Sequence, residues 1–281
     1  PVCSELHIAP STYYHCQQQR HHPDKRSARA QRDDWLKKEI QRVYDENHKV
    51  YGVRKVWRQL LREGIRVARC TVARLMAVMG LAGVLRGKKV RTTISRKAVV
   101  AGDRVNRQFV AERPDQLWVA DSTYVSTWQG VVYVAFIIDV FAGYIVGWRV
   151  SSSMETTFVL DALEQALWAR RPSGTVHHSD KGSQYVSLAY TQRLKEAGLL
   201  ASTGSTGDSY DNAMAESING LYKAEVIHRK SWKNRAEVEL ATLTWVDWYN
   251  NRRLLERLGH TPPAEAEKAY YASIGNDDLA A

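Results

Sequence analysis

The run of residues 117–125, L-W-V-A-D-S-T-Y-V, constrains the fold of this chain more than any other stretch. Apolar side chains occupy both its odd and its even positions, which is the pattern of a strand covered on both faces. Such a strand belongs inside a sheet that carries helices on its two sides. Asp121 lies in the middle of the run, where an unpaired carboxylate would cost several kcal/mol. The run therefore predicts a buried strand and a carboxylate that needs a compensating cation.

The sequence downstream alternates strand and helix patterns, which is typical of one mixed sheet with helices on its faces. Apolar runs bounded by turn residues predict strands at 117–125, 131–138, 144–150, 175–179 and 199–203. Helical periodicity predicts helices at 155–170, 184–197, from Asp211 onward and at 235–250, with Gly259, Pro262 and Pro263 ending the regular structure. We expect an α/β fold built on a mixed five-stranded sheet with flanking helices.

Two further carboxylates lie where they suit a shared site. Asp180 follows the strand predicted at 175–179, and Glu216 lies in the helix that begins near residue 211. A divalent cation shared by Asp121, Asp180 and Glu216 would offset the cost of burying Asp121, and oxygen-only ligands favour Mg²⁺ or Mn²⁺ over zinc. Three carboxylates in a strongly basic chain without ligand cysteines point to two-metal phosphoryl transfer.

Each carboxylate also has a purely structural interpretation. Asp139, which ends the apolar run 131–138, is typical of a turn residue, and Asp180 or Glu216 alone would deserve the same interpretation. The joint occurrence of a strand aspartate, a strand-end aspartate and a helical glutamate favours the catalytic interpretation.

The helix that carries Glu216 sorts its side chains onto two faces. At about 100° per residue, Met214, Ile218 and Leu221 cluster on one face, and Glu216, Asn219 and Lys223 cluster on the opposite one. We expect the first face to pack on the core and the second to point toward a metal and a phosphate strand. A solvated surface face is the alternative.

Charge divides the chain into two parts. Residues 1–112 contain 24 Lys and Arg against 10 Asp and Glu, a balance of +14, whereas residues 113–281 contain 16 against 20, a balance of −4. The amino-terminal part is therefore the candidate electrostatic anchor for DNA, and the carboxyl-terminal part holds the acids that a metal site needs.

The basic part contains a candidate helix-turn-helix. Amphipathic helices are predicted from Asp33, at 54–62 and at 70–79, with Gly64 in the turn between the last two. We expect Trp35, Ile40, Val43 and Tyr44 to form the buried stripe of the first helix, and Arg69, Thr71 and Arg74 to be the exposed DNA-binding candidates on the third. An ordinary three-helix bundle with a solvated basic face is the alternative.

Composition disfavours several classes of protein. The three cysteines form no paired spacing, which favours a reducing cytoplasm, and no C-x-x-C accompanies the histidine pairs to make a zinc site. No apolar stretch approaches the length of a membrane span, and the first residues show no signal-peptide pattern. We expect a cytoplasmic, nucleoid-associated protein without a membrane partner. Because the first residue is proline, we also expect a fragment or a processed or frameshifted product.

A series of motifs in fixed order resembles the catalytic OrfB half of IS-three family insertion-sequence transposases, which are relatives of retroviral integrases. The motifs are Y-G-V-R-K-V-W-R-Q-L from position 51, W-V-A-D-S-T-Y from 118, H-S-D-K-G-S-Q-Y from 178, D-N-A-M-A-E-S from 211 and W-V-D-W-Y-N-N-R-R-L from 245. The resemblance implies an RNase H-like core whose metal-binding triad is Asp121, Asp180 and Glu216. It also identifies Lys223 as a basic residue placed two helical turns after the glutamate.

The resemblance and the patterns together suggest a domain organisation. We expect a truncated helical remnant and linker at 1–32, a small all-α helix-turn-helix domain at 33–80, a basic linker at 81–113, an RNase H-like integrase catalytic core at 114–230 and a helical extension at 231–281. Lys88 and Lys89 in the basic linker are further candidates for DNA contact.

The family implies a bacterial transposase that binds two Mg²⁺ or Mn²⁺ ions and attacks phosphodiesters with water and then with a freed 3′-hydroxyl. Its implied partners are double-stranded DNA, at the terminal inverted repeats of an element and at a target, further copies of itself on that DNA, and an upstream-frame protein. A catalytically silent DNA-binding remnant or repressor is the alternative, against which the intact carboxylates argue. The basic helical region disfavours a ribonuclease H-like nuclease without strand transfer.

Overall fold

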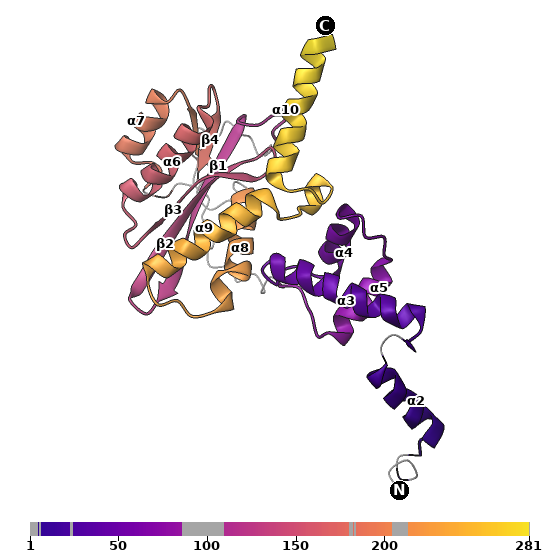
Figure 1. Cartoon of the computed structure of the whole chain (residues 1–281). Coiled ribbons are helices and arrows are strands. Elements are labelled where there is room, and N and C mark those ends of the chain that lie inside the picture. The colour runs from indigo at the N-terminus through magenta and orange to yellow at the C-terminus, as the bar shows by residue number, and fades with distance from the viewer. Residues whose placement is uncertain are drawn as a thin grey trace. The chain divides into compact units, whose positions relative to one another are not determined.

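The structure is a computed structural model of the chain, and it describes residues 5, 7–22, 25–85, 110–179, 182, 184–203 and 213–280. For residues 203 and 276–280 it describes the backbone alone. The chain divides into two compact units, Pro1–Val84 and Leu85–Ala281. Figure 1 shows the helical first unit and the mixed α/β second unit.

Three helices with a common apolar core form most of the first unit: α3 (Ala28–Glu46), α4 (Val53–Arg62) and α5 (Arg69–Val78) (Figure 1). The core consists of Leu36, Ile40 and Val43 on α3, Val56 and Leu60 on α4, and Val72, Leu75 and Met76 on α5. Gly64 ends α4 with a φ of +83°, a conformation that side chains with a Cβ rarely adopt. The predicted pair of helices joined by a glycine turn is therefore present.

One expectation for this unit is wrong. Trp35, expected in the buried stripe, is 47% exposed, and Leu36 takes its place, because the i, i+4, i+7 spacing of 36, 40 and 43 aligns one face of α3. Residues 1–32, where we expect a helical remnant and a linker, contain α2 (Pro10–His21) and the beginning of α3. None of the side chains of α2 is buried.

The second unit is built on a mixed sheet of five strands in the order β3-β2-β1-β4-β5 (Figure 1). The strands are β1 (Leu117–Thr127), β2 (Gly130–Asp139), β3 (Tyr144–Ser151), β4 (Val176–Ser179) and β5 (Leu200–Thr203). The first three form an antiparallel meander, and β4 and β5 run parallel to β1. This is the RNase H-like arrangement, and it confirms the predicted fold class, with β1 as the central strand.

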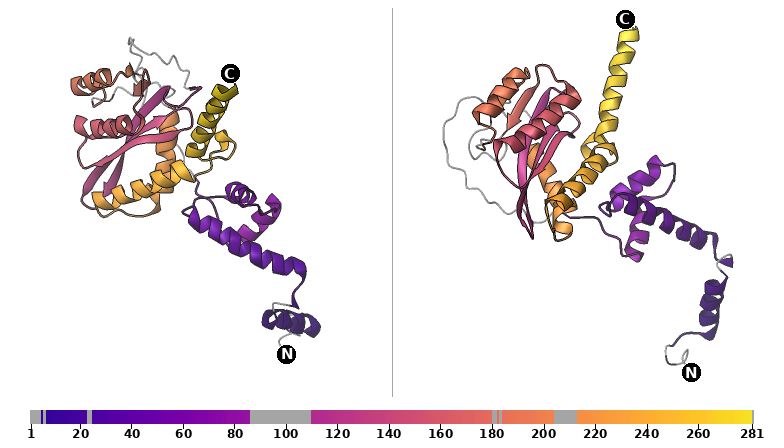
Figure 2. Two further views of the ribbon diagram at one scale, coloured as in Figure 1. Left: turned by 45° about the horizontal axis from the view of Figure 1, so that its top comes forward. Right: turned by 60° about the vertical axis from the view of Figure 1, so that its left-hand side comes forward.

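Helices cover both faces of this sheet (Figure 2). On one face α6 (Thr156–Arg170) and α7 (Leu188–Glu196) close a core that includes Trp118, Ala120, Ile137 and Leu163. On the other face lie α8 (Ala213–Glu225) and α9 (Arg235–Asn251), whose Tyr222 and Trp245 rings pack on Phe136 of β2. The first four residues of β1 are buried on both faces, as the apolar run predicts. From Asp121 onward the expectation is wrong: Asp121 and Ser122 are half-buried and Tyr124 is 64% exposed, so only the first part of the run is covered on both faces.

Close approach of α6 to β3 depends on Gly147. A Cβ at this position would overlap the carbonyl oxygen of Ala162 and lie 3.0 Å from the Ala166 Cβ. The helix backbone therefore packs directly on the strand backbone, which only glycine permits at this point.

The carboxyl-terminal region differs from the expectation that regular structure ends near Gly259, Pro262 and Pro263. Gly259 does interrupt it, with a φ of +71°, but α10 (Pro263–Ala280) follows at once (Figure 1). Proline is well tolerated in the first turn of a helix because its missing N–H would have no partner there. Over the described residues, no helix combines the length and the apolar character that crossing a membrane requires.

Candidate functional site

Asp121 lies at the centre of the candidate active site, in the middle of β1. It is half-buried, and its backbone is opposite Phe136 in the β1–β2 register. Its Oδ1 accepts a hydrogen bond of 2.8 Å from the Ser122 amide, and its Oδ2 accepts one of 2.8 Å from Nδ2 of Asn219. Both carboxylate oxygens are thus held by fixed N–H donors, one from the strand and one from α8.

Helix α8 places Glu216 in its first turn, where the side chain is exposed. Glu216 lies one helical turn before Asn219, whose side chain bonds Asp121. The structure therefore brings the beginning of α8 next to the middle of β1, as a site shared by Asp121 and Glu216 requires. Oxygen donors from a half-buried aspartate and an exposed glutamate fit a hard divalent cation.

The two predicted faces of α8 are only partly correct. Ile218 is buried as expected, whereas Met214 and Leu221 are half-buried. Asn219, expected on the outward face with Glu216, is 5% exposed and points to the sheet. The hydrogen bond to the Asp121 carboxylate explains this difference, because a paired amide can be buried at little cost.

Asp180 lies outside the described residues, so the third predicted ligand has no described position. Over the described residues, no group of three or more His, Cys, Asp or Glu side chains is arranged to hold a metal ion. Asp180 directly follows β4, in which His177, His178 and Ser179 are buried. β4 runs parallel to β1, and the last residue pair between the two strands is Ala120 and Ser179.

The buried histidines of β4 contact polar side chains within the core. His177 Nε2 lies 3.1 Å from the Tyr190 hydroxyl, and His178 Nδ1 lies 3.0 Å from the Ser202 hydroxyl. Burial lowers the pKa of His177 to about 4, because the charged ring would lose its hydration. His177 is therefore neutral at physiological pH and packs β4 against α7.

Lys223 is half-buried near the carboxyl end of α8, two turns after Glu216. Its Nζ lies 5.9 Å from the centre of the Tyr124 ring, within the range of a cation–π contact. Tyr124 belongs to β1, three residues after Asp121, and its side chain is 64% exposed. The lysine thus lies beside the same strand as Asp121, next to an exposed aromatic ring.

Two further buried contacts fix α8, and the sequence patterns missed both. The Tyr222 hydroxyl lies 2.6 Å from the Thr242 hydroxyl on α9. At the end of α8, Glu225 accepts hydrogen bonds from Arg253 and, at 3.0 Å, from Trp245 Nε1. The only hint in the sequence is the pair of arginines at the end of the motif W-V-D-W-Y-N-N-R-R-L. Arg253, the second of them, is buried, and a buried arginine requires an acidic partner, which here is Glu225. Trp245 is 3% exposed, and its ring packs on Phe136 and Tyr222.

A second group of charged residues lies near the beginning of β1. Asp139, expected as a turn residue, is fully buried and accepts hydrogen bonds from the amides of Asp115 (2.6 Å) and Phe141 (2.9 Å). Its pKa is raised to about 7, chiefly by burial. Close by, Arg170 of α6 forms an ion pair of 2.8 Å with Glu267 of α10. This group connects α6, α10 and the sheet.

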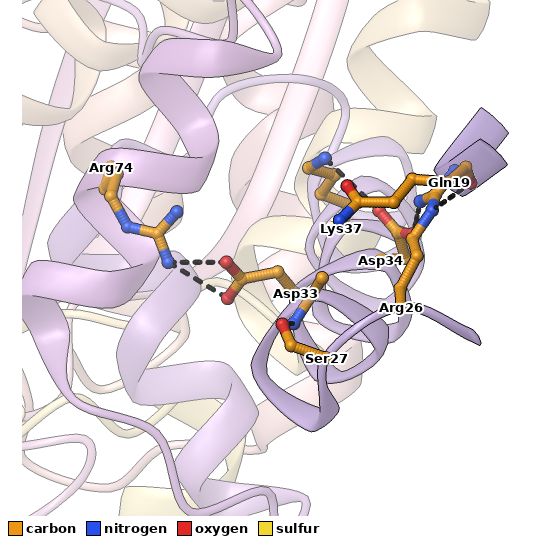
Figure 3. Close-up of polar contacts among 8 residues, drawn as sticks. Gln19, Arg26, Ser27, Asp33, Asp34, Lys37 and Arg74 are labelled. Atoms are coloured by element: carbon orange, nitrogen blue, oxygen red, sulfur yellow. Dashed lines mark hydrogen bonds and ion pairs between the residues drawn. The ribbon is translucent and has the colours of Figure 1, made fainter. Parts of the chain in front are cut away.

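The predicted DNA-binding residues of α5 differ in their exposure and contacts. Arg69 and Arg74 are exposed, as expected. Thr71, also expected to be exposed, is half-buried. Nη2 of Arg74 bonds both carboxylate oxygens of Asp33, at 2.9 and 2.8 Å (Figure 3). Lys88 and Lys89 lie outside the described residues.

Known proteins resemble both units. The HTH-like domain family matches residues 31–89, and the Integrase core domain family matches residues 111–209 and, in a second segment, residues 197–263. One solved structure with a similar arrangement is the HTLV-2 integrase catalytic core domain in complex with magnesium. That likeness has a TM-score of 0.43 at 13% identity and covers 56% of this chain and 98% of that one.

Relatives in sequence are much more similar. The chain is 98% identical over 281 residues to the transposase for insertion sequence element IS629 of Shigella sonnei, covering 100% of this chain and 95% of that protein. It is 54% identical over 273 residues to the putative transposase for insertion sequence element IS986/IS6110 of Mycobacterium tuberculosis, covering 94% of this chain and 96% of that protein. These matches span both units, so the chain belongs to the insertion-sequence transposases that combine an HTH-like domain with an integrase core.

Proposed function

We propose that this transposase cleaves phosphodiesters at the ends of its insertion sequence and joins the freed ends to target DNA, at a site formed by Asp121, Asp180 and Glu216. The observation that carries the proposal is the Asn219–Asp121 hydrogen bond, which brings the helix of Glu216 to the strand of Asp121. In the proposed reaction, water attacks the scissile phosphorus and the bond to the 3′-oxygen breaks, leaving a 3′-hydroxyl. That hydroxyl then attacks a phosphorus of the target DNA, and the bond from this phosphorus to the target's own 3′-oxygen breaks, so that the target strand leaves with a 3′-hydroxyl.

The three carboxylates would hold two Mg²⁺ or Mn²⁺ ions, whose chemistry is to lower the pKa of a bound water and to stabilise charge on the phosphate. Asp121 contributes a carboxylate whose orientation is already fixed by two N–H donors. Glu216 contributes an exposed one at the beginning of a helix. One fixed and one exposed carboxylate suit a metal ion that also binds DNA, because some of the coordination positions of the ion must stay open to the substrate.

DNA binding by this chain follows from its HTH-like and integrase core domains, and we assign it to two surfaces. In the second unit, Lys223 would contact the phosphate next to the scissile one, as a point charge that tolerates varied geometry. In the first unit, α5 would bind the terminal inverted repeats through Arg69 and Arg74, with Lys88 and Lys89 adding backbone contacts. We further propose that several copies assemble on the DNA, in the nucleoid and together with an upstream-frame protein.

Cleavage assays with Mg²⁺ on a duplex carrying one element end test the proposal. Asp121→Asn, Asp180→Asn and Glu216→Gln should each abolish cleavage while retaining DNA binding, because each removes a ligand charge at nearly constant volume. Asp161→Asn is the matched control, since Asp161 is an exposed carboxylate on α6 that pairs with Arg149. Near-native cleavage by any of the first three variants would exclude that residue from the site. DNA binding without cleavage by the unchanged protein would favour a silent remnant or repressor.

A further inference from the structure

We infer that Asn219 is a positioning residue for the catalytic site: it fixes the Asp121 carboxylate and sets the distance between Asp121 and the helix that carries Glu216. The inference rests on the proposed metal site and names a residue outside the predicted triad.

The first argument is the direction of the hydrogen bond. A carboxylate can only accept hydrogen bonds, so the amide nitrogen of Asn219, and not its oxygen, must face Asp121 Oδ2 at 2.8 Å. Because the Ser122 amide binds the other oxygen, Oδ1, at 2.8 Å, rotation of the carboxylate about its side-chain bond would break two contacts. Asn219 therefore selects one orientation of Asp121 in the absence of any ligand.

The second argument is that packing alone does not explain an asparagine at this position. Asn219 is 5% exposed, between the apolar core of α8 and the sheet. Its Oδ1 is buried and has no hydrogen-bond partner among the described residues. An apolar side chain such as leucine would fill the same space without an unsatisfied oxygen. What leucine cannot supply is the N–H that binds Asp121.

The third argument is the way α8 is attached to the rest of the unit. Asn219, Tyr222 and Glu225 follow each other at intervals of three residues on one side of the helix, and each uses a polar group to bind a different element. Tyr222 and Glu225 bind the α9 region, whereas Asn219 alone of these three binds β1. The first two contacts fix the helix on its neighbours, and the third fixes it relative to the candidate metal ligand.

Metal binding without DNA tests this role. The full-length protein is titrated with MnCl₂, and the rise in melting temperature gives the Mn²⁺ concentration for half-maximal stabilisation. Asn219→Leu should raise this concentration by roughly 10–100-fold, the usual effect of removing a group that orients a metal ligand. Asp121→Asn should abolish the stabilisation, and in that background Asn219→Leu should have no additional effect on it, because the oriented group is already lost.

The matched control is Tyr222→Phe, which removes a buried hydrogen bond from the same helix one turn away without touching Asp121. It should lower the melting temperature of the metal-free protein and leave the half-maximal Mn²⁺ concentration within about twofold, because Tyr222 bonds Thr242 and orients no proposed metal ligand. Should Asn219→Leu not fold, Asn219→Ser, which also removes the amide, takes its place with the same expectation.

The outcomes separate this inference from the proposed function. Unchanged Mn²⁺ dependence in the Asn219 variant, together with loss of stabilisation in Asp121→Asn, would overturn the positioning role and leave the metal site intact. Equal Mn²⁺ stabilisation of Asp121→Asn and the unchanged protein would overturn the metal site itself. An equal shift in Tyr222→Phe and the Asn219 variant would show a general effect of loosening α8, which also contradicts the inference.

Discussion

The buried pair of Glu225 and Arg253 offers a direct test of how the second unit holds α8. Their side chains are 3% and 5% exposed, and Nε of Arg253 lies 3.2 and 3.1 Å from the two carboxylate oxygens. Arg253→Met would leave the Glu225 carboxylate buried with the Trp245 N–H as its remaining donor within this cluster. Breaking one partner of a buried pair in this way costs about 3–5 kcal/mol.

The double variant Glu225→Gln, Arg253→Met should be more stable than Arg253→Met alone. Glutamine still accepts the Trp245 hydrogen bond through its carbonyl oxygen, and it has no charge that needs a partner. We expect the second substitution to restore at least about 2 kcal/mol, because replacing a whole buried ion pair by neutral groups is often close to neutral.

Urea unfolding followed by tryptophan fluorescence gives the free energy of unfolding of each variant. The values can be compared when the dependence of this free energy on urea concentration has the same slope in all variants. Arg149→Met is the control, because Arg149 and Asp161 form an exposed pair, 49% and 52% accessible, whose loss should cost no more than about 1 kcal/mol. A cost below about 1 kcal/mol for Arg253→Met, or strict additivity in the double variant, would refute this account of the pair.

Four further outcomes are expected. Burial raises the pKa of Asp139 from 3.8 to about 7 in the folded protein. Between pH 4 and 7 this carboxyl is therefore protonated in the folded state and ionised in the unfolded state, so the free energy of unfolding should fall by up to about 4 kcal/mol as the pH rises over this range. Urea unfolding at several pH values should show a smaller fall for Asp139→Asn. Gly147→Ala should lower the unfolding free energy by about 1–3 kcal/mol in the same assay because it pushes α6 from β3, whereas Gly275→Ala, in open space on α10, should not. Lys223→Ala should weaken binding to element ends and slow cleavage in a gel assay, and Lys223→Arg should largely retain both, since a positive charge suffices at this position. Arg74→Ala should weaken specific binding by about 1–3 kcal/mol in a mobility-shift titration if Arg74 reads a base, with a much smaller effect on unrelated DNA.

The sequence predicted the sheet well because its signal is local. The five strands of the mixed sheet follow from apolar runs of characteristic length, and the structure has all of them. The motif order predicted the family, which the relatives confirm. The roles of Asp121, Asp180 and Glu216 stay predictions that the proposed variants test.

What the sequence could not predict depends on contacts between distant residues. A helical projection assigns Asn219 to the outward face because it counts apolarity, whereas burial of this amide depends on a carboxylate 98 residues away in the chain. Asp139 ends β2 and accepts the Phe141 amide, as expected of a turn residue, but the local pattern does not predict its complete burial or its hydrogen bond from the Asp115 amide, 24 residues earlier in the chain. Both cases are tertiary effects that local pattern does not contain.

If Arg74 binds DNA as proposed, Asp33 would compete with the DNA for it. Arg74 would have to leave the carboxylate that now binds it at 2.8 Å, and the Asp33 charge would then have no such partner near the DNA. Leaving Asp33 would cost the same on every sequence that Arg74 binds, so Asp33 would weaken DNA binding in general and would not favour the element ends over random DNA. An Asp33→Asn protein should then bind both kinds of duplex more tightly in a mobility-shift titration.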